Sequence, residues 1–227
     1  MSVIRKYKAT VKEIRNPLKD VFTVSFQTDR KFQYSPGQFL HLALDTYDPS
    51  MQWPDSRCFS MQSVPQEEYV TITYAVKGKF TQRMSEELCT NKTVWLKMPY
   101  GDLFQRQHLK DHCVFIAGGT GITPFLSLFG DASFTQYQEP KLYFGVRSKA
   151  YNVFDKELCD AQKVNPQFSN AIVYQDIDGI LDIGDIYTEN KGSTFFISGP
   201  PIMISSFKKF LISHNSPEEK VITDDWE

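Results

Sequence analysis

The chain has 227 residues, of which 41% are hydrophobic and 23% are charged, and its formal net charge is −2. This composition is typical of a globular protein with one large domain or two domains of about 110 residues each. No basic blocks are present, which argues against a surface that coats nucleic acid, and polar residues interrupt every apolar run, which argues against a membrane-spanning helix.

The first hundred residues predict short strands. The segments 8–14, 21–28, 38–44, 69–76 and 93–98 are rich in Val, Thr, Phe and Tyr and often alternate polar with apolar residues. Turn signals with Pro, Gly, Asn and Asp separate them. This spacing predicts an antiparallel barrel or sandwich.

From about residue 110 the pattern changes to strands that alternate with helices. We expect strands at 112–117, 141–146, 170–175, 194–199 and 220–226, and helices at 122–129, 153–163 and 200–214. Such alternation predicts parallel crossovers and a doubly wound α/β sheet. A polar link at 104–112 gives two expected domains, 1–108 and 109–227.

The start of the chain and its cysteines bear on location. Residues 1–14 alternate charged and apolar side chains and lack the apolar stretch of a secretory signal, so a cytoplasmic protein is expected. The four cysteines (Cys58, Cys89, Cys113 and Cys159) lie far apart, without the spacing of a zinc site, a redox pair or an iron–sulfur loop. Scattered reduced thiols and no metal are therefore expected.

Three glycines follow the strand at 112–117. Gly118, Gly119 and Gly121 would let the backbone approach a flat or anionic group, and the N–H groups of the next helix would point at it. Thr120 and Thr123 could add hydroxyl groups, and Pro124 suits a first helical turn. A tight turn without a ligand is the alternative.

A second strand end, at 195–203, again carries Gly and Pro before a helix. Gly199 and Pro200 could bracket a dinucleotide together with the first glycine turn. The alternative is a simple helix start that Ser198 caps.

The barrel half adds two motifs. Residues 57–63 precede a strand, and Arg57 could bind a phosphate, Phe59 could flank a flat ring and Ser60 could hydrogen-bond a ring nitrogen. The alternative is a surface ion pair and a core phenylalanine. Residues 76–88 place Gly78 at a turn and Thr81 near a helix start, where N–H groups suit a pyrophosphate, or where a helix simply begins.

In this order, the motifs resemble the ferredoxin–NADP reductase superfamily over nearly the whole chain. Arg-x-Tyr/Phe-Ser is met at 57–60, Gly-x-x-Ser/Thr at 78–81 and Gly-Gly-x-Gly-Ile-x-Pro at 118–124. Residues 143–148 are similar to the family's Tyr-x-Gly-x-Arg strand end, and 198–203 to its Cys-Gly-Pro-x-x-Met, with Ser198 in place of the cysteine. The phrases at 35–39 and 99–104 also match recurrent barrel phrases.

The resemblance implies an antiparallel Greek-key β-barrel that binds FAD, followed by the α/β domain that binds NADH or NADPH. Hydride would pass from the nicotinamide to the flavin, and the protein would position the two rings. The residues with an implied catalytic role are Ser60, Thr123, Ser198 and Trp226. The implied cofactor-binding residues are Arg57, Cys58, Phe59, Ser60, Tyr74, Val76, Gly78, Lys79, Phe80, Thr81, Gly118, Gly119, Thr120, Gly121, Thr123, Pro124, Arg147, Asp176, Gly199, Pro200 and Trp226. Trp226 could stack on the flavin or cap the last strand.

The choice of cofactors follows from charge. Asp176 and Asp178, after the third strand of the second domain, would repel a 2′-phosphate, whereas Arg147 and Ser148 could bind one. NADH is therefore slightly favoured over NADPH. FAD is favoured over FMN because Arg57 and the segment 78–81 suggest a pyrophosphate site.

The resemblance implies a stand-alone, monomeric NAD(P)H-dependent reductase. With no iron–sulfur or haem segment fused, its acceptor would be external: a ferredoxin, a flavodoxin or an oxygenase component. Nucleic acid and membranes are not expected partners. The alternatives are an electron-transfer subunit of a larger oxidoreductase and a non-catalytic flavin-binding module.

Overall fold

The computed structural model describes residues 3–224. The chain divides into two compact units, Met1–Asp102 and Leu103–Glu227, which we call the barrel unit and the parallel-sheet unit. The domain bounds 1–108 and 109–227 stay a prediction.

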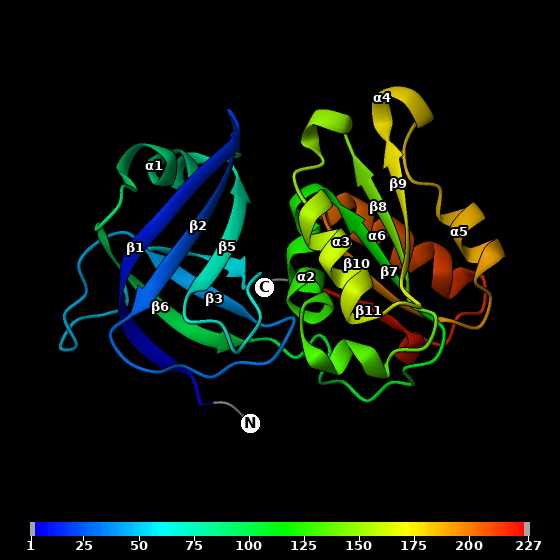
Figure 1. Cartoon of the computed structure of the whole chain (residues 1–227), viewed down its shortest axis with the longest axis horizontal. Helices are drawn as coiled ribbons and strands as arrows, with labels where there is room; N and C mark the ends of the chain where they lie inside the picture. The colour runs from blue at the N-terminus through cyan, green and yellow to red at the C-terminus, as the bar shows by residue number, and fades with distance from the viewer. Residues whose placement is uncertain (1–2, 225–227) are drawn as a thin grey trace. The chain divides into compact units, whose positions relative to one another are not determined.

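The barrel unit is one antiparallel sheet with the spatial order β4-β3-β6-β1-β2-β5 (Figure 1). Its strands are β1 Arg5–Leu18, β2 Val21–Thr28, β3 Phe39–Ala43, β4 Ser56–Ser60, β5 Val70–Ala75 and β6 Thr93–Tyr100. The Gln62 N–H donates to the Thr71 carbonyl (2.8 Å), so the chain after β4 is joined to β5 and the sheet nearly closes. The expected antiparallel barrel is confirmed.

Alternation decides which side chains fill this barrel. In β1, Tyr7, Ala9 and Val11 are buried in the core, while Lys6 and Lys8, which alternate with them, point to the other face. Helix α1 (Lys79–Glu87) adds Phe80 and Met84 to the same core. The barrel is therefore filled by side chains.

One strand was misread in the sequence. The segment from Arg57 onward was expected to precede a strand, but it lies in β4, which pairs with β3. Its register sets Cys58 opposite His41 and Arg57 opposite Leu42, on the two different faces of the sheet. The mixed polar composition of the segment does not indicate a strand, and β4 depends on its pairing with β3.

The parallel-sheet unit has the strand order β11-β10-β7-β8-β9, with all strands parallel. The strands are β7 Cys113–Gly118, β8 Lys141–Val146, β9 Ser169–Tyr174, β10 Thr194–Ser198 and β11 Val221–Thr223. The helices are α2 Thr123–Phe129, α3 Asp155–Val164, α4 Gln175–Asp178, α5 Ile183–Glu189 and α6 Pro201–Ser213, and the 3₁₀ turns are η1 Gly119–Ile122, η2 Ala132–Gln136, η3 Lys149–Tyr151 and η4 Glu218–Lys220. The doubly wound sheet is confirmed; the sequence reading did not anticipate α4 and α5.

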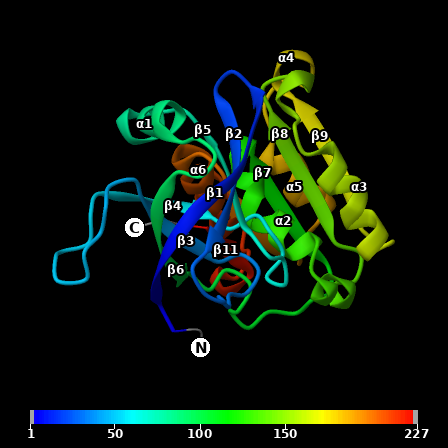
Figure 2. The ribbon, with the colours of Figure 1, turned by 60° about the vertical axis from the view of Figure 1, so that its left-hand side comes forward.

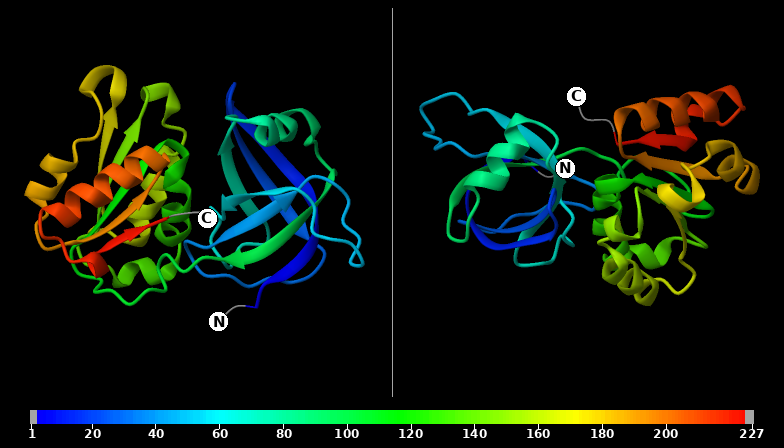
Figure 3. Two further views of the ribbon diagram at one scale, coloured as in Figure 1. Left: turned by 180° about the vertical axis from the view of Figure 1, so that it is seen from behind. Right: turned by 90° about the horizontal axis from the view of Figure 1, so that it is seen from above.

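Helices cover both faces of this sheet. Helices α2 and α3 lie on one face, and α5 and α6 lie on the other, as the front and rear views show (Figures 1 and 3). At the centre of the first face, the buried Phe115 ring stacks on Phe196 (5.2 Å between centroids) and meets Phe129 edge-on (5.1 Å). Aromatic packing of this kind fixes α2 against β7.

The strand order locates the switch point of the sheet. From β7 the chain runs outward through β8 and β9, then returns to place β10 and β11 on the other side of β7. Ligands of such sheets bind at the carboxyl ends of the strands where the order reverses. Here that point lies between β7 and β10, where both glycine turns begin.

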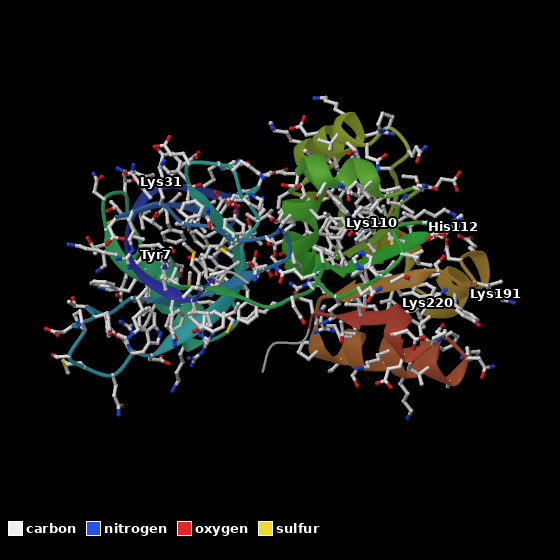
Figure 4. The ribbon with its side chains drawn as sticks, turned by 90° about the horizontal axis from the view of Figure 1, so that it is seen from below. Tyr7, Lys31, Lys110, His112, Lys191 and Lys220 are labelled. Atoms are coloured by element: carbon white, nitrogen blue, oxygen red, sulfur yellow. The ribbon has the colours of Figure 1, made fainter. Side chains whose placement is uncertain are left out.

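Basic residues lie at the opposite, amino-terminal end of these strands, among acidic ones such as Asp111 and Glu219. Lys110 and His112 precede β7, Lys191 precedes β10 and Lys220 precedes β11, and Figure 4 shows them along one side of the unit. Lys220 donates to the Gly192 carbonyl (2.7 Å), so it fastens a loop. Within residues 3–224, no helix combines the length and apolar character needed to cross a bilayer.

Candidate functional site

The two glycine turns of the parallel-sheet unit touch each other. Because β7 and β10 are parallel neighbours with Ala117 opposite Ser198, the turns that follow them lie side by side. A Cβ atom on Gly121 would stand 2.5 Å from the Gly199 Cα, and one on Gly118 would stand 2.8 Å from the Pro200 Cδ. The close approach that excludes side chains here is thus between two backbones of the chain itself.

Gly119 differs from its neighbours. Its φ is +55°, and a Cβ placed on it would have no atom within 4 Å. Its absent side chain therefore serves the turn conformation and leaves open space beside the backbone. Of the three glycines in this turn, Gly119 is the one beside which a ligand would find room.

The hydroxyl groups of Thr123 and Ser198 make hydrogen bonds within the parallel-sheet unit. The Thr123 hydroxyl donates to the Thr120 carbonyl (2.9 Å), and Pro124 lies in the first turn of α2, as expected. The Ser198 hydroxyl donates to Asp224 Oδ2 (3.0 Å), and both residues are buried. Helix α6 begins at Pro201, and its N-cap Pro200 makes no side-chain capping bond, so the structure contradicts the alternative in which Ser198 caps the helix.

Asp224 is a residue that the sequence reading missed. It directly follows β11, and its N–H donates to the Ile197 carbonyl (2.9 Å), which brings its carboxylate beside the end of β10. An acidic residue directly after a buried strand is a signal that could have found it. Trp226, to which a flavin-stacking role was assigned, lies outside the described residues.

In the barrel unit, Arg57 lies beside the start of α1. Its guanidinium carbon is 5.3 Å from the centre of the Phe80 ring, in the first turn of that helix. The same guanidinium donates to Asp55 Oδ1 (2.6 Å) and to the Ser56 carbonyl (2.8 Å). The structure therefore brings two of the expected motifs together, and it also shows the surface ion pair of Arg57 that the alternative reading of this segment expected.

The hydroxyl of Thr81 closes the start of α1. It accepts hydrogen bonds from the N–H groups of Lys77 (2.9 Å) and Gly78 (3.1 Å) and donates to the Gly78 carbonyl (3.0 Å). The first-turn N–H groups of Lys79 and Phe80 have no acceptor within a helix and carry its partial positive charge. These N–H groups and the Arg57 guanidinium could bind an anion together.

A buried phenol lies next to β4. The Tyr74 ring meets Phe59 edge-on (6.0 Å) and stacks on Phe22 (5.4 Å), and only 3% of Tyr74 is exposed. Its hydroxyl has no hydrogen-bond partner among the described residues, and burial raises the pKa of this phenol. An unpaired buried hydroxyl costs about 1–3 kcal/mol, so it is a position where a polar ligand atom would be stabilising. Val76, two residues on, donates its N–H to the Asp20 carbonyl (2.8 Å).

Cys58 and Ser60 face away from Arg57. The Cys58 Sγ lies 3.5 Å from the His41 Nε2, and burial raises the pKa of the thiol. The pKa of His41 is lowered, first by burial and then by Lys97. Cys58 is therefore a neutral thiol beside a neutral imidazole, and its side chain does not share the face of Arg57. Ser60 is buried opposite Phe39.

Asp176 and Arg147, the residues expected to affect nucleotide choice, lie together at the carboxyl end of the parallel sheet. The Asp176 N–H, in α4, donates to the Arg147 carbonyl (3.1 Å) after β8. The side chains of both residues are exposed, and the Arg147 guanidinium lies over the Tyr151 ring (5.6 Å). Asp178 instead accepts from the Tyr174 N–H (2.9 Å) and holds α4 in place. Among residues 3–224 there is no cluster of three His, Cys, Asp or Glu side chains that could hold a metal ion.

Two family models match the chain. The model of an FAD-binding domain matches residues 3–145, and the model of an oxidoreductase NAD-binding domain matches residues 115–209. The first match runs beyond the barrel unit as far as β8, and the second covers both glycine turns.

Curated relatives share the sequence over much of its length. The phenol hydroxylase P5 protein of Acinetobacter pittii is 28% identical over 244 residues, covering 98% of this chain and 66% of that protein. The ferredoxin–NAD(P)+ reductase component of the naphthalene 1,2-dioxygenase system of Pseudomonas putida is 29% identical over 164 residues, covering 71% and 46%. The chain thus spans about half to two thirds of the length of these relatives.

Solved structures share the fold. A cytochrome P450 reductase from Amycolatopsis superposes with a TM-score of 0.83 at 19% identity, covering 99% of this chain and 71% of that one. A ferredoxin NADP+ reductase from Neisseria gonorrhoeae with bound FAD and NADP superposes with a TM-score of 0.76 at 18% identity, covering 95% and 93%. At these identities the likeness is one of fold.

The contact between the glycine turns can be tested by substitution. Gly121→Ala places a methyl group against the Gly199 backbone, which has no side chain to move aside, so we expect a loss of on the order of 3 kcal/mol or more of unfolding free energy. Gly119→Ala, in open space, meets only the unfavourable φ and should cost about 1–2 kcal/mol. Urea unfolding followed by circular dichroism measures both, and equal losses would contradict the assigned contact.

Proposed function

Because the chain belongs to the FAD-binding domain family, within the ferredoxin–NADP reductase-like superfamily, we propose that it is an NAD(P)H-dependent flavoprotein reductase that passes electrons to an external acceptor. The observation that carries the proposal is the guanidinium of Arg57 beside the first turn of α1, on the strand that holds the flavin motif. When bound, FAD accepts a hydride and releases its electrons one or two at a time.

Arg57 and α1 would hold the FAD pyrophosphate. The guanidinium can donate bidentately to a phosphate, and the first-turn N–H groups of Lys79 and Phe80 add partial positive charge. Thr81 keeps the helix start closed, so its role is to present these N–H groups. The unpaired Tyr74 hydroxyl supports an FAD site at β4, because a polar atom of the cofactor would remove its unfavourable burial.

The two glycine turns would bind the nicotinamide nucleotide. Their position at the switch point of a parallel sheet supports this assignment, as does the open space beside Gly119. Thr120 lies at the same turn with its side chain half-buried. Ser198 and Asp224 would orient the reacting ring. The Ser198 hydroxyl donates a hydrogen bond to the Asp224 carboxylate, so the lone pairs of its oxygen can accept a hydrogen bond from the ring.

We propose NADH as the preferred reductant. Asp176 is exposed after β9, where a carboxylate can accept hydrogen bonds from a ribose 2′-hydroxyl and repels a 2′-phosphate. Arg147, its backbone neighbour, would favour NADPH, but its guanidinium lies over the Tyr151 ring. The proposed preference for NADH thus depends on the carboxylate of Asp176.

The acceptor would be a ferredoxin, a flavodoxin or an oxygenase component. Relatives named as the reductase components of a naphthalene dioxygenase and of a propane monooxygenase support this class. The same relatives are longer than this chain, which favours a second candidate, the electron-transfer part of a larger oxidoreductase. A cytoplasmic location, a monomeric state and the absence of membrane and nucleic-acid partners stay predictions.

Anaerobic titration tests the whole proposal. Purified protein loaded with FAD is mixed with NADH or NADPH, and the flavin absorbance is followed in a stopped-flow instrument. We expect loss of the oxidised flavin band, faster with NADH than with NADPH. Protein that binds FAD but is not reduced by either nucleotide would instead be a non-catalytic flavin-binding module.

The charge at β4 predicts opposite effects of two substitutions on FAD affinity. Arg57→Ala removes a charged donor and should raise the FAD dissociation constant about tenfold or more. Asp55→Asn frees the same guanidinium from an exposed ion pair and should lower the FAD dissociation constant about two- to fivefold. Fluorescence titration of the apoprotein measures both. The control is Asp48→Asn, which makes the same charge change at an exposed residue that binds Ser50; if it matches Asp55→Asn, the effect is general and the assignment fails.

Asp176 controls the choice of nucleotide in this proposal. Asp176→Ser should narrow the preference for NADH over NADPH by about tenfold, because it removes both the acceptor for the 2′-hydroxyl and the repulsion of the 2′-phosphate. The ratio of kcat/KM for the two nucleotides measures this change. Asp178→Ser, at the neighbouring carboxylate that binds the Tyr174 N–H, is the matched control and should leave the ratio unaltered.

A further inference from the structure

A cysteine and a histidine lie side by side on the outer face of the barrel unit. Cys58 of β4 is directly opposite His41 of β3, and Figure 2 shows these two strands next to each other. The Cys58 Sγ lies 3.5 Å from the His41 Nε2 and 3.7 Å from its Nδ1, and both side chains are half-buried. The fold thus brings together a thiol and an imidazole that are 17 positions apart in the sequence.

The stability of the sheet does not explain this pair. The backbones of β3 and β4 pair from Phe39 opposite Ser60 to Ala43 opposite Ser56, whichever side chains they carry. A thiol is a weak donor and a weak acceptor, so its contact with an imidazole adds little to that pairing. Thiolate and imidazole are, however, both ligands of copper and zinc.

The separation of the two atoms fits one metal ion between them. Metal–sulfur and metal–nitrogen bonds to cysteine and histidine are about 2.3 and 2.0 Å long, so one ion can bond both atoms when they are no more than about 4.3 Å apart. The 3.5 Å from Sγ to Nε2 and the 3.7 Å from Sγ to Nδ1 are within this limit. Either ring nitrogen could therefore share an ion with the sulfur without movement of the strands.

The number of ligands decides which metal fits. Zinc sites have four protein ligands when they are structural and three when they are catalytic. Among residues 3–224, no group of three His, Cys, Asp or Glu side chains is placed to hold a metal ion. Cu(I) is a soft ion that one thiolate and one imidazole can bind between them. The pair therefore suits Cu(I) better than Zn²⁺.

The charge around the pair also favours a monovalent ion. Lys97 of β6 lies opposite His41, and Lys6 of β1 lies opposite Lys97 in turn. Like charges directly opposite each other in a sheet are destabilising, so this row already carries an excess of positive charge. A thiolate and Cu(I) together have no net charge, whereas a thiolate and Zn²⁺ would add a positive charge beside Lys97. A half-buried position tolerates the neutral complex better.

The surroundings of His41 keep it in the form that binds metals. Its ring meets the Tyr100 ring edge-on (4.7 Å between centroids), and Tyr100 stacks on Phe39 (5.5 Å). Burial lowers the pKa of His41, and Lys97 lowers it further. A neutral imidazole has one nitrogen with a free lone pair, which is the atom that a metal ion takes.

We propose that Cys58 and His41 bind one Cu(I) ion through the Cys58 Sγ and a ring nitrogen of His41. The ion replaces the thiol proton, which passes to solvent, and nothing is oxidised or reduced. Arg57 lies opposite Leu42 of the barrel core, with its guanidinium beside Phe80, so the metal site and the proposed phosphate site are on different faces of the sheet. The inference does not depend on the proposed reductase activity.

Competition with a coloured chelator tests the site. FAD-loaded protein, with its thiols reduced and oxygen excluded, is titrated with the Cu(I) complex of bicinchoninate, and the loss of the violet absorbance gives the copper taken up. The starting protein carries Cys89→Ser and Cys159→Ser, which remove the two exposed thiols as competing ligands. Cys113 is left in place, because it is buried and donates to the Leu109 carbonyl (3.2 Å).

We expect the starting protein to take up one Cu(I) per chain. Cys58→Ser should abolish this uptake, and His41→Phe should raise the Cu(I) dissociation constant at least about tenfold, because it removes one of two ligands and keeps an aromatic ring in place. The matched control is His214→Phe, at an exposed histidine that caps α6, and it should bind Cu(I) as the starting protein does.

X-ray absorption at the copper edge identifies the bound atoms without any substitution at the site. We expect one sulfur and one nitrogen donor in the starting protein. Circular dichroism shows which variants remain folded, and for a variant that does not fold, the donor set of the starting protein decides the assignment.

Several results would overturn the proposal. They are no uptake by the starting protein, full uptake by folded Cys58→Ser, equal affinities of the folded His41→Phe and His214→Phe variants, and an absorption spectrum with sulfur donors alone. Tighter binding of Zn²⁺ than of Cu(I) in the same competition would contradict the assignment of a monovalent ion.

Discussion

The contact between the backbones of Gly121 and Gly199 fixes the carboxyl edge of the parallel sheet. With a Cβ on Gly121 only 2.5 Å from the Gly199 Cα, the two turns have one arrangement in which they pack. That arrangement sets where α2 and α6 begin, and so where their first-turn N–H groups lie. It also leaves Gly119, at a φ of +55°, beside open space. The cradle proposed for the nicotinamide nucleotide is thus built from backbone.

In the barrel unit, too, contacts within the chain hold the proposed binding groups in place. Helix α1 begins at Lys79, directly after its N-cap Gly78, and the Thr81 hydroxyl accepts hydrogen bonds from the N–H groups of Lys77 and Gly78 without any ligand. Arg57 is held over Phe80 by an exposed pair with Asp55, which is weak enough to exchange for a phosphate. Both proposed anion sites are therefore formed in advance, and binding an anion there needs little ordering of the chain.

Most of the fold could be predicted from the sequence, because the spacing of apolar residues and the positions of turn residues determine its strands and helices. The strand 21–28 was expected at the bounds that β2 has, and 141–146 at those of β8. Strand β4 was misread because Ser, Arg and Cys have no clear alternation, and its position depends on pairing with β3. Helices α4 and α5 are short, and their positions depend on packing against the sheet. Such tertiary effects are not visible in a local pattern.

Side-chain roles were harder to predict than backbone positions. The sequence indicated the glycine turns, but whether their glycines face a ligand or each other is a property of the strand order. For Ser198 it offered a role at the nucleotide site or, as the alternative, a helix cap, whereas the hydroxyl binds Asp224, which follows another strand end. A surface ion pair of Arg57 was one of two alternatives, but its partner, Asp55, could not be named, because pairing between near neighbours depends on how the loop turns.

The two opposed lysines of β1 and β6 have a consequence for how the barrel unit responds to its solvent. Dissolved ions shorten the range of every exposed charge, to about 10 Å at 0.1 M ionic strength and less above it. Between Lys6 and Lys97 this screening relieves a repulsion, so added salt strengthens the folded sheet.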